Sequence, residues 1–320
     1  MLQSSFTCLI IDYMHPSIVP MLEALGISVS YQPEIKAQAV KSMLPGFNSL
    51  IVRSKLFVSE ELLQGADKLQ LIARAGAGVD NIDEAALRRR RITLLNAPEG
   101  NSDAVGEFTL GLLLALFRNV VKANQEVREG IWLREENRGE EIMGKTIGIF
   151  GYGNMGRAFA KRLAGFSCEV LAYDSNAAVQ PDNFAKLVSL QELQEQADVV
   201  SFHIPFTPEN KHLGKESFFN AFRKNIWVLN TARGEIMNQT DLVKLLQSGK
   251  IKGAALDVLE NEKLSSLTPE QQLNFSYLAR NEKIILTPHI GGWSHQSYVK
   301  INEVLVQKIK NFLQDVATSA

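Results

Sequence analysis

The sequence has few cysteines, which argues against a fold built on disulfides. Only two of the 320 residues are cysteines, Cys8 and Cys168, and both lie in apolar runs. Such cysteines are typically buried thiols, and a reducing compartment keeps them reduced. No basic segment precedes the first apolar stretch, and Asp12 interrupts that stretch, so we expect no secretory signal. These features together predict a cytoplasmic protein.

Long hydrophobic runs and an excess of one charge are also missing. The most apolar run covers residues 108–117; a membrane span needs about 20 residues, so we expect a buried helix and no membrane partner. The chain carries 34 basic and 35 acidic residues, which does not favour nucleic acid as a partner. The cluster Arg88–Arg91 is expected at the end of a short helix over 83–90, where cations offset the helix dipole. No metal site is predicted.

Short apolar runs rich in β-branched residues alternate with helical stretches in the first third of the chain. The helical stretches include 16–25 and 59–65. The expected strands cover 7–11, 28–31, 49–52, 69–74 and 92–95. Strands that alternate with helices predict a parallel sheet covered on both faces.

A long helix separates this array from a second one. We expect it to begin near Asn101 or Ser102, with Ser102 as the N-cap, and to reach about Arg128, before Gly130. The second array has six expected strands, at 146–150, 170–173, 199–203, 227–230, 254–258 and 284–287. An amphipathic helix is expected over 294–313.

A glycine motif follows the expected strand 146–150 and opens a helix. It is G-x-G-x-x-G in the context that dinucleotide binding requires. The first glycine permits a tight turn, the second lets the backbone approach a pyrophosphate, and the third allows close packing of helix on strand. The start of the helix offers free N–H groups to the phosphates. We assign to the cofactor site Gly151, Gly153, Asn154, Met155 and Gly156.

Asp174 completes this motif, because it follows the next expected strand, 170–173, at about the 20-residue interval typical of dinucleotide sites. A carboxylate there can accept hydrogen bonds from the adenosine ribose hydroxyls and would repel a 2′-phosphate. The sequence therefore predicts NAD as the cofactor in preference to NADP.

The two arrays together predict an α/β protein with two doubly wound parallel-sheet domains and a cleft between them. We place a flavodoxin-like substrate-binding domain at residues 1–98 and 293–320, and a Rossmann NAD-binding domain at residues 99–292. The chain would then pass between the domains twice, which suits closure over a small-molecule substrate.

Polar residues follow three expected strands of the second array. Arg233 follows strand 227–230, and His289 follows strand 284–287, at the edge of the sheet where ligands bind. A histidine suits the base that removes a hydroxyl proton during hydride transfer. A neighbouring carboxylate would orient the ring, and an arginine can hold a substrate carboxylate. Both Glu260 and Glu262 are placed to supply that neighbouring carboxylate.

These residues resemble the D-isomer-specific 2-hydroxyacid dehydrogenases over almost the whole chain. The resemblance implies an NAD-dependent oxidoreductase of D-2-hydroxy acids. Its catalytic arginine, glutamate and histidine would fall on Arg233, Glu262 and His289. The resemblance also implies that the cofactor site includes Ile204, Pro205, Thr231, Ala232, Asp257 and Gly291.

Within this family, the chain is most similar to the branch that oxidises 3-phosphoglycerate in the first step of serine biosynthesis. The similarity implies substrate contacts from Arg53, Ser54, Arg74, Ala77, Gly78 and Arg134. Three guanidinium groups suit a phosphate. The resemblance further implies a homodimer formed by the long helix and the arm after it. The chain ends at Ala320, so the C-terminal regulatory domain of some relatives is not expected.

Departures from the family pattern keep other functions open. Glu135 and Glu136 follow Arg134, where relatives are often basic or aromatic, so a hydroxypyruvate or glyoxylate reductase is an alternative. Another class of protein, an NAD-sensing binding protein without activity, has a similar fold. His203 is interpreted as structural or adjacent to the cofactor, and His212 receives no role.

Overall fold

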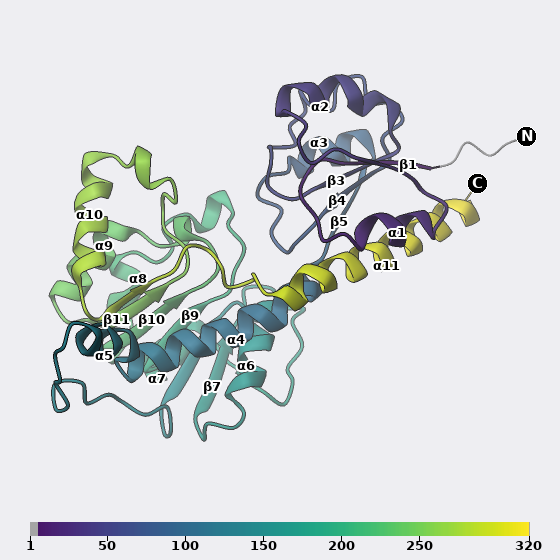
Figure 1. Cartoon of the computed structure of the whole chain (residues 1–320). Helices are drawn as coiled ribbons and strands as arrows, with labels where there is room; N and C mark the ends of the chain where they lie inside the picture. Colours follow the sequence, from purple (N-terminus) through teal and green to yellow (C-terminus); the bar gives the residue numbers. More distant parts are fainter. Residues whose placement is uncertain (1–5, 320) are drawn as a thin grey trace, which may run out of the picture. The chain divides into compact units, whose positions relative to one another are not determined.

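The computed structural model describes residues 6–319, which form two compact α/β units (Figure 1). The first unit contains the residues up to Asn101 together with those from Trp293 onward, and the second contains Ser102–Gly292. Both ends of the chain therefore belong to one unit. In each unit all strand pairs are parallel, as the alternation of strands and helices predicts.

The first unit is built on a sheet with the strand order β2-β1-β3-β4-β5, the flavodoxin-like order. Its strands are β1 (Thr7–Ile10), β2 (Ser28–Tyr31), β3 (Ser49–Val52), β4 (Leu71–Arg74) and β5 (Thr93–Asn96). The helices are α1 (Ile18–Glu23), α2 (Ala37–Met43), α3 (Glu84–Arg90) and α11 (His295–Ser319). One core contains buried side chains of α1 and α11, and the other contains those of α2 and α3. Figure 1 shows α1 lying along α11.

The second unit has a sheet of seven strands in the order β12-β11-β10-β9-β6-β7-β8. The strands are β6 (Thr146–Phe150), β7 (Glu169–Tyr173), β8 (Lys186–Leu187), β9 (Val199–Phe202), β10 (Ile226–Asn230), β11 (Ile251–Leu256) and β12 (Ile284–Leu286). Chain order reverses between β6 and β9, and at such a point the carboxyl ends of the strands leave a crevice for a dinucleotide. This is the Rossmann arrangement that the sequence predicts.

Helices cover both faces of this second sheet. They are α4 (Pro98–Phe117), α5 (Val120–Arg128), α6 (Asn154–Leu163), α7 (Leu190–Gln196), α8 (Glu216–Asn220), α9 (Gln239–Gln247) and α10 (Pro269–Arg280). Buried residues of α4 and α6 share one core, and those of α7, α8, α9 and α10 share the other. Short 3-10 helices cover Leu44–Gly46, Pro208–Asn210, Gly234–Ile236 and Leu264–Ser266.

The long helix differs from its prediction at both the start and the middle. Helix α4 begins at Pro98 instead of Asn101 or Ser102, so Ser102 lies inside the helix and is not its N-cap. Proline is well suited to the first turn of a helix, because it has no backbone N–H to leave unpaired there. The long helix is interrupted at Asn119, whose φ is +53°, so that α4 and α5 meet at a bend of 63°. Among the described helices none alone has the length and apolarity of a membrane span, although this bent pair passes that test of length and composition.

Other expected elements also need correction. Residues 59–65 form turns instead of a helix, and the segment ends at Gly65 with a φ of +76°. The C-terminal helix extends to Ser319, beyond the expected residue 313. The two-residue strand β8 and the helix α10 were among the elements not predicted. A capping box at Thr268 and a proline in the first turn begin α10, and both were readable from the sequence.

The two cysteines differ in burial, contrary to the prediction that both are buried. Cys8 lies in β1 and is 1% exposed, and burial raises the pKa of its thiol to about 12. Cys168 is only partly buried, and burial also raises the pKa of its thiol. Both cysteines are free thiols in the structure.

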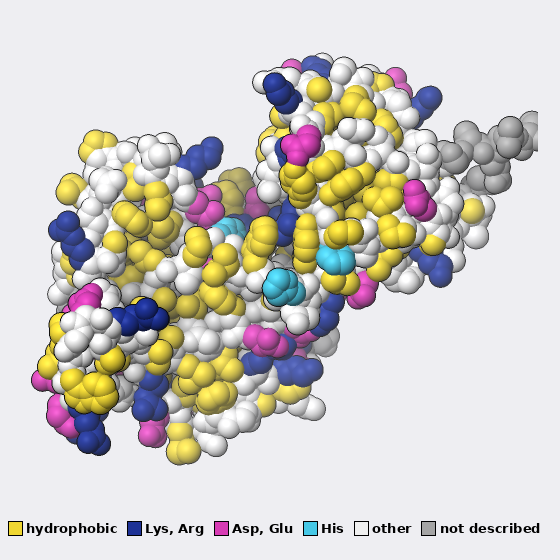
Figure 2. Space-filling view, viewed as in Figure 1, with side chains coloured by type: hydrophobic (Ala, Val, Ile, Leu, Met, Phe, Trp, Pro, Cys, Tyr) yellow, Lys and Arg dark blue, Asp and Glu magenta, His cyan; other side chains and the backbone are white. Residues whose placement is uncertain are grey.

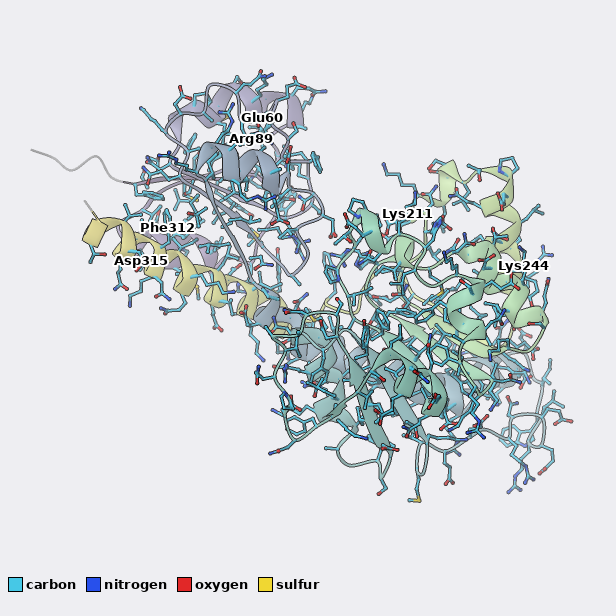
Figure 3. All side chains as sticks on the ribbon, turned by 180° about the vertical axis from the view of Figure 1, so that it is seen from behind. Glu60, Arg89, Lys211, Lys244, Phe312 and Asp315 are labelled. Atoms are coloured by element: carbon cyan, nitrogen blue, oxygen red, sulfur yellow. The ribbon has the colours of Figure 1, made fainter. Side chains whose placement is uncertain are left out.

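Charged side chains of both signs are interspersed over the face seen in Figure 2. The arginine cluster at the end of α3 follows this pattern, because Glu60 accepts hydrogen bonds from Arg89 at 2.8 Å and Arg90 at 2.7 Å. Figure 3 shows Arg89 beside Glu60. Two of the four arginines are therefore held by one carboxylate of their own unit.

Candidate active site

The glycine turn after β6 has the close packing that dinucleotide binding requires. Gly151 has a φ of +99°, and a Cβ there would lie 2.6 Å from Cγ2 of Ile204. A Cβ on Gly156 would lie 2.1 Å from the carbonyl oxygen of Gly151. Apart from Gly153 and its two chain neighbours, no atom of the described residues lies within 4 Å of a Cβ built on Gly153, so the backbone is open to a ligand there. The turn therefore fits a pyrophosphate at the start of α6.

Asp174 is fixed against this turn by two backbone groups. Its carboxylate accepts hydrogen bonds from the N–H of Tyr152 at 2.7 Å and the N–H of Asn176 at 2.8 Å. An ionised carboxylate has further lone pairs on each oxygen, so Asp174 can still accept the ribose hydroxyls of NAD. The residues present thus fit this cofactor.

Tyr152 and Arg157 hold the loop that follows Asp174. The buried Tyr152 hydroxyl donates to Oδ1 of Asp182 at 2.7 Å, and Arg157 donates to Oδ2 at 2.6 Å. Arg157 also lies over the Tyr152 ring, 4.5 Å from its centroid. Burial and this carboxylate raise the pKa of Tyr152. This cluster was not predicted, because Asp182 lies in an irregular segment.

His289 and Glu262 come together at the carboxyl end of the second sheet. Nδ1 of His289 lies 2.9 Å from Oε1 of Glu262 and 3.1 Å from Oε2. Both side chains are nearly half exposed, 44% for the histidine and 48% for the glutamate. The other candidate glutamate, Glu260, pairs with His212 instead, at 2.7 Å. The structure therefore assigns Glu262 as the partner of His289.

Asp257 anchors the loop that carries His289. Its carboxylate is 1% exposed and accepts hydrogen bonds from the Thr287 hydroxyl at 2.6 Å, the Ile290 N–H at 2.9 Å and the Gly291 N–H at 2.7 Å. Its backbone oxygen accepts from the N–H of His289 at 2.7 Å. These contacts hold His289 at a φ of +56°, which is uncommon for a residue with a side chain. Asp257 thus orients the loop, and its predicted role beside the cofactor stays a prediction.

Arg233 lies in a tight turn after β10, which Asn230 stabilises. The Asn230 side chain accepts from the N–H of Ala232 at 3.1 Å and donates to the carbonyl of Arg233 at 3.0 Å. The hydroxyl of Thr231 lies 3.0 Å from that of Thr109 on α4. Arg233 itself is partly buried. Asn230 was not among the predicted site residues, because its role is to shape the turn.

Asp12 builds the loop that carries Arg53 and Ser54 in the first unit. It is 7% exposed and accepts hydrogen bonds from the backbone N–H groups of Arg53, Ser54 and Lys55, at 2.8, 3.2 and 3.1 Å. The Lys55 side chain is also fixed here, because its ammonium group donates to the carbonyls of Pro33 and Ile35.

Two aromatic rings cover the Arg53 guanidinium. The group lies 4.3 Å from the ring centroid of Trp293 and 5.4 Å from that of Tyr298. Burial lowers the pKa of Arg53, an effect opposed by Tyr298 and Asp12. Stacking fixes the plane of the guanidinium and leaves its edge for hydrogen bonds. Neither aromatic residue was predicted, since cation–π pairs leave no pattern in a sequence.

The remaining predicted substrate residues fall in both units. Arg74 ends β4 opposite Val52, so it lies beside the start of the Arg53 loop. A Cβ on Gly76 would collide with the Arg74 guanidinium, and the carbonyl of Ala77 accepts from Asn96 at 2.7 Å. Gly78 follows, partly buried. Arg134 belongs to the second unit and is exposed.

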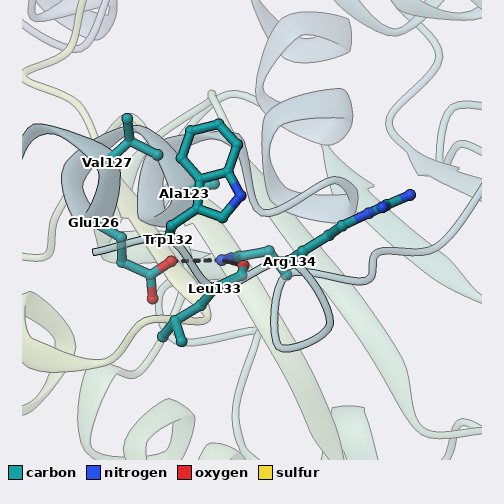
Figure 4. A pocket seen from close by; sticks show the side chains of 7 residues that line it. Ala123, Glu126, Val127, Trp132, Leu133 and Arg134 are labelled. Atoms are coloured by element: carbon teal, nitrogen blue, oxygen red, sulfur yellow. Dashed lines mark hydrogen bonds between the residues drawn. The ribbon is translucent and has the colours of Figure 1, made fainter. Parts of the chain in front are cut away.

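Arg134 lines a surface pocket of the arm that follows α5. The pocket is lined by Ala123, Glu126, Val127, Trp132, Leu133, Arg134 and Asn137 (Figure 4). Asn137 donates a hydrogen bond to Glu126 across it. Nearby, Glu135 pairs with Arg138, so one of the two acidic residues that depart from the family pattern is neutralised locally.

Comparisons with known proteins agree with this geometry. Residues 110–291 match the model of the D-isomer specific 2-hydroxyacid dehydrogenase NAD-binding domain. A D-3-phosphoglycerate dehydrogenase of Methanocaldococcus jannaschii is 32% identical over 96% of this chain and 57% of its own length. A hydroxypyruvate reductase of Thermotoga maritima is 31% identical over 86% of this chain and 88% of its own length. The chain thus spans little more than half of the phosphoglycerate dehydrogenases that it matches.

Solved structures show the same fold. The TT0316 protein of Thermus thermophilus is 30% identical, with a TM-score of 0.79 over 94% of both chains. A D-lactate dehydrogenase of Aquifex aeolicus, solved with NAD and lactic acid, is 25% identical, with a TM-score of 0.82 over 97% of this chain and 96% of that one. The chain therefore belongs to the D-isomer specific 2-hydroxyacid dehydrogenases, a family of NAD-dependent oxidoreductases.

Proposed function

We propose that this dehydrogenase interconverts 3-phosphoglycerate and 3-phosphohydroxypyruvate, the first step of serine biosynthesis. The observation that carries the proposed chemistry is the contact of His289 with Glu262, 2.9 Å long, at the carboxyl end of the NAD-binding sheet. The similarity to phosphoglycerate dehydrogenases over most of the chain supports the choice of substrate.

In the proposed mechanism His289, Glu262 and Arg233 each have one task. NAD supplies the hydride acceptor when it is bound. His289 removes the proton of the C2 hydroxyl as the hydride leaves C2, so that a ketone forms. Glu262 orients the imidazole and stabilises its protonated form. Arg233 binds the substrate carboxylate and polarises the C2 oxygen. In the reverse direction the protonated His289 returns its proton to the ketone oxygen.

Arg53 supports a phosphorylated substrate. Its guanidinium is oriented by Trp293 and Tyr298 and its backbone by Asp12, and a planar guanidinium of fixed orientation suits bidentate contact with a phosphate. Arg74, Arg134 and the backbone of Ala77 and Gly78 complete the proposed substrate contacts.

A steady-state assay tests this choice of substrate. It compares 3-phosphoglycerate with D-glycerate, using NAD and NADP in parallel. We expect kcat/KM for the phosphorylated acid with NAD to be higher by at least about tenfold, which corresponds to ~1.4 kcal/mol. Arg53→Gln should remove most of that preference and leave the rate with D-glycerate nearly unchanged. Equal losses on both acids would contradict the proposed role of Arg53.

A second candidate function is reduction of hydroxypyruvate or glyoxylate. Two observations favour this function. Glu136 places an acidic side chain two residues after Arg134, and the chain is similar to a hydroxypyruvate reductase over 88% of that protein's length. The chemistry at His289 would be the same. A higher kcat/KM for hydroxypyruvate than for 3-phosphohydroxypyruvate with NADH would establish this alternative.

We also propose that the protein is a homodimer through α5 and the arm after it. This region exposes large apolar side chains, with Val120 at 52%, Val127 at 52% and Trp132 at 81% exposed. Contiguous exposed apolar side chains are typical of protein–protein interfaces. Light scattering after gel filtration should give twice the mass of the chain for the wild type and a smaller mass for Trp132→Asp. A wild-type monomer would contradict the proposal.

We propose the cytoplasm as its compartment, on the ground that both cysteines are free thiols and that a reducing compartment preserves such thiols. Cell fractionation with an antibody against the chain tests this. Recovery in an oxidising, extracytoplasmic fraction would exclude it.

A further inference from the structure

The turn that carries Arg233 is enclosed by two loops of the same unit. The turn continues into the 3-10 helix Gly234–Ile236. One flanking loop follows β9 and includes residues 206–214, and the other follows β11 and includes residues 257–262. Both loops contact the backbone of the turn, from segments that are distant in the sequence.

The loop after β9 is attached to the turn by backbone hydrogen bonds. The N–H of His212 donates to the carbonyl of Glu235 at 2.9 Å, and the N–H of Gly214 donates to the carbonyl of Ile236 at 2.9 Å. Gly214 also pairs with Met237 in an isolated parallel bridge. His212 adopts a φ of +53° in this loop, which costs free energy for a residue with a side chain. The surrounding contacts must therefore hold it there.

The loop after β11 packs against the other side of the turn. A Cβ on Gly234 would lie 1.9 Å from the carbonyl oxygen of Leu259 and 2.6 Å from the nitrogen of Glu260. The backbones of turn and loop are thus in direct contact. Oε2 of Glu260 also accepts a hydrogen bond from the N–H of Gln239, at 3.4 Å.

His212 and Glu260 connect the two loops. Nε2 of His212 lies 2.7 Å from Oε1 of Glu260, and the side chains are 31% and 22% exposed. Since an ionised carboxylate only accepts, Nε2 is the donor. This hydrogen bond completes a closed set of contacts around Gly234–Ile236. We propose that His212 and Glu260 are positioning residues, which hold the Arg233 turn in place by joining the loops on either side of it.

This inference rests on the proposed role of Arg233 and makes a separate prediction. His212→Ala breaks the connection, whereas His212→Gln can still donate from its amide nitrogen, which corresponds to Nε2 of the ring. We expect His212→Ala to lower kcat by roughly tenfold, because small displacements of a catalytic group cost up to about 10² in rate. His212→Gln should restore most of the rate. The KM for NAD should change less than kcat in both variants, since Thr231 and Ala232 of this turn are expected cofactor contacts but the pyrophosphate and ribose contacts at the glycine turn and Asp174 are not disturbed.

The experiment measures kcat, the KM for NAD and thermal unfolding for His212→Ala, His212→Gln, Glu260→Ala and the double alanine variant. Glu192→Ala is the matched control, because it removes an ion pair of the same 2.7 Å length elsewhere in the unit. The double variant should lose no more activity than one single variant, since both remove the same contact. Additive losses, or an unchanged kcat in the single alanine variants, would overturn the inference.

The two proposals fail in different ways. A wild-type protein that oxidises none of the hydroxy acids would end the proposed function. A fully active wild type with an equally active His212→Ala variant would end only the positioning role. If His212→Ala unfolds in the assay, a folded Glu260→Ala whose kcat falls more than its KM for NAD changes still supports the inference, and full activity of that variant refutes it.

Discussion

Two histidine–glutamate pairs lie in the second unit, and their surroundings differ. His289 and Glu262 are 44% and 48% exposed, and the buried Asp257 anchors the loop that carries His289. His212 and Glu260 are 31% and 22% exposed, and they join two loops that pack against the Arg233 turn. The same chemical pair therefore serves two purposes. An accessible imidazole can exchange a proton with a substrate, whereas the less accessible one is placed to hold backbone segments together.

A third histidine extends this comparison, because it has no carboxylate partner among the described residues. His203 follows β9 and is 8% exposed, and its Nε2 lies 2.8 Å from the Ser201 hydroxyl. Burial lowers its pKa to about 3. This imidazole is neutral at physiological pH, which agrees with the prediction that His203 is structural or adjacent to the cofactor and not catalytic.

The largest effect is expected from His289→Gln, which removes the proposed base. General acid–base catalysis contributes about 10²–10⁴ in rate, so we expect kcat to fall by that amount. Binding of NAD, measured by fluorescence titration, should be unchanged. The matched variant His212→Gln should keep most of its rate. Similar losses in both variants would remove the distinction between the two pairs.

A smaller effect is expected from exchanging each glutamate for glutamine. Glu262→Gln keeps the size of the side chain but removes the charge that stabilises the protonated His289. We expect kcat to fall by roughly 10–100-fold, a part of the acid–base contribution. Glu260→Gln keeps an oxygen that can accept from His212, so its kcat should stay within about threefold of the wild type. A greater loss in Glu260→Gln than in Glu262→Gln would reverse our assignment of the two pairs.

Asp257→Asn tests whether the Asp257 carboxylate orders the loop that carries His289. The asparagine keeps one carbonyl oxygen, but its amide nitrogen would face the N–H group of Ile290 or Gly291. We expect a loss of about 1–3 kcal/mol in the free energy of unfolding, the cost of an unsatisfied buried group, together with a lower kcat. Urea denaturation measures the first and steady-state assays the second. Unchanged values of both would show that the carboxylate does not order the His289 loop.

The last prediction concerns the effect of His203 on the pH dependence of the free energy of unfolding. The unfolded chain binds a proton at this histidine below about pH 6.5, whereas the folded chain does so only near pH 3. The contribution of His203 to stability is therefore complete above pH 6.5 and is lost as pH falls toward 3. Between pH 7 and pH 5 we expect a loss of roughly 2 kcal/mol. Urea denaturation at both pH values should show a smaller loss in His203→Gln, and an equal loss would contradict this assignment.

The sequence predicts strand and helix bounds well where a short stretch of residues determines them. The strands 28–31, 49–52 and 146–150 have the predicted bounds in the structure, because each segment is followed directly by a polar or glycine residue. The break at Asn119 was not predicted, since a left-handed residue between two helices leaves no break in helical periodicity. Residues 59–65 were predicted to be a helix, but tertiary packing favours turns there.

Site residues could be predicted where they belong to a sequence motif. Residues that orient the site through contacts with distant parts of the chain were harder to predict. The glycine turn, Asp174, Arg233 and His289 follow strands, and their spacing is visible in the sequence. The residue pattern alone left both Glu260 and Glu262 open, because both lie in one irregular loop, and the family resemblance selected Glu262. Asp12, Trp293 and His212 were missed as site residues, since each meets its partner across a separation that no local pattern records.

The most direct test of the account is a steady-state assay of wild type and His289→Gln with 3-phosphoglycerate and NAD. The account predicts NADH formation by the wild type and a rate at least about 10²-fold lower in the variant, at equal occupancy of NAD. A His289→Gln variant as active as the wild type, or a wild type that binds NAD but forms no NADH from any of the hydroxy acids tested, would contradict it.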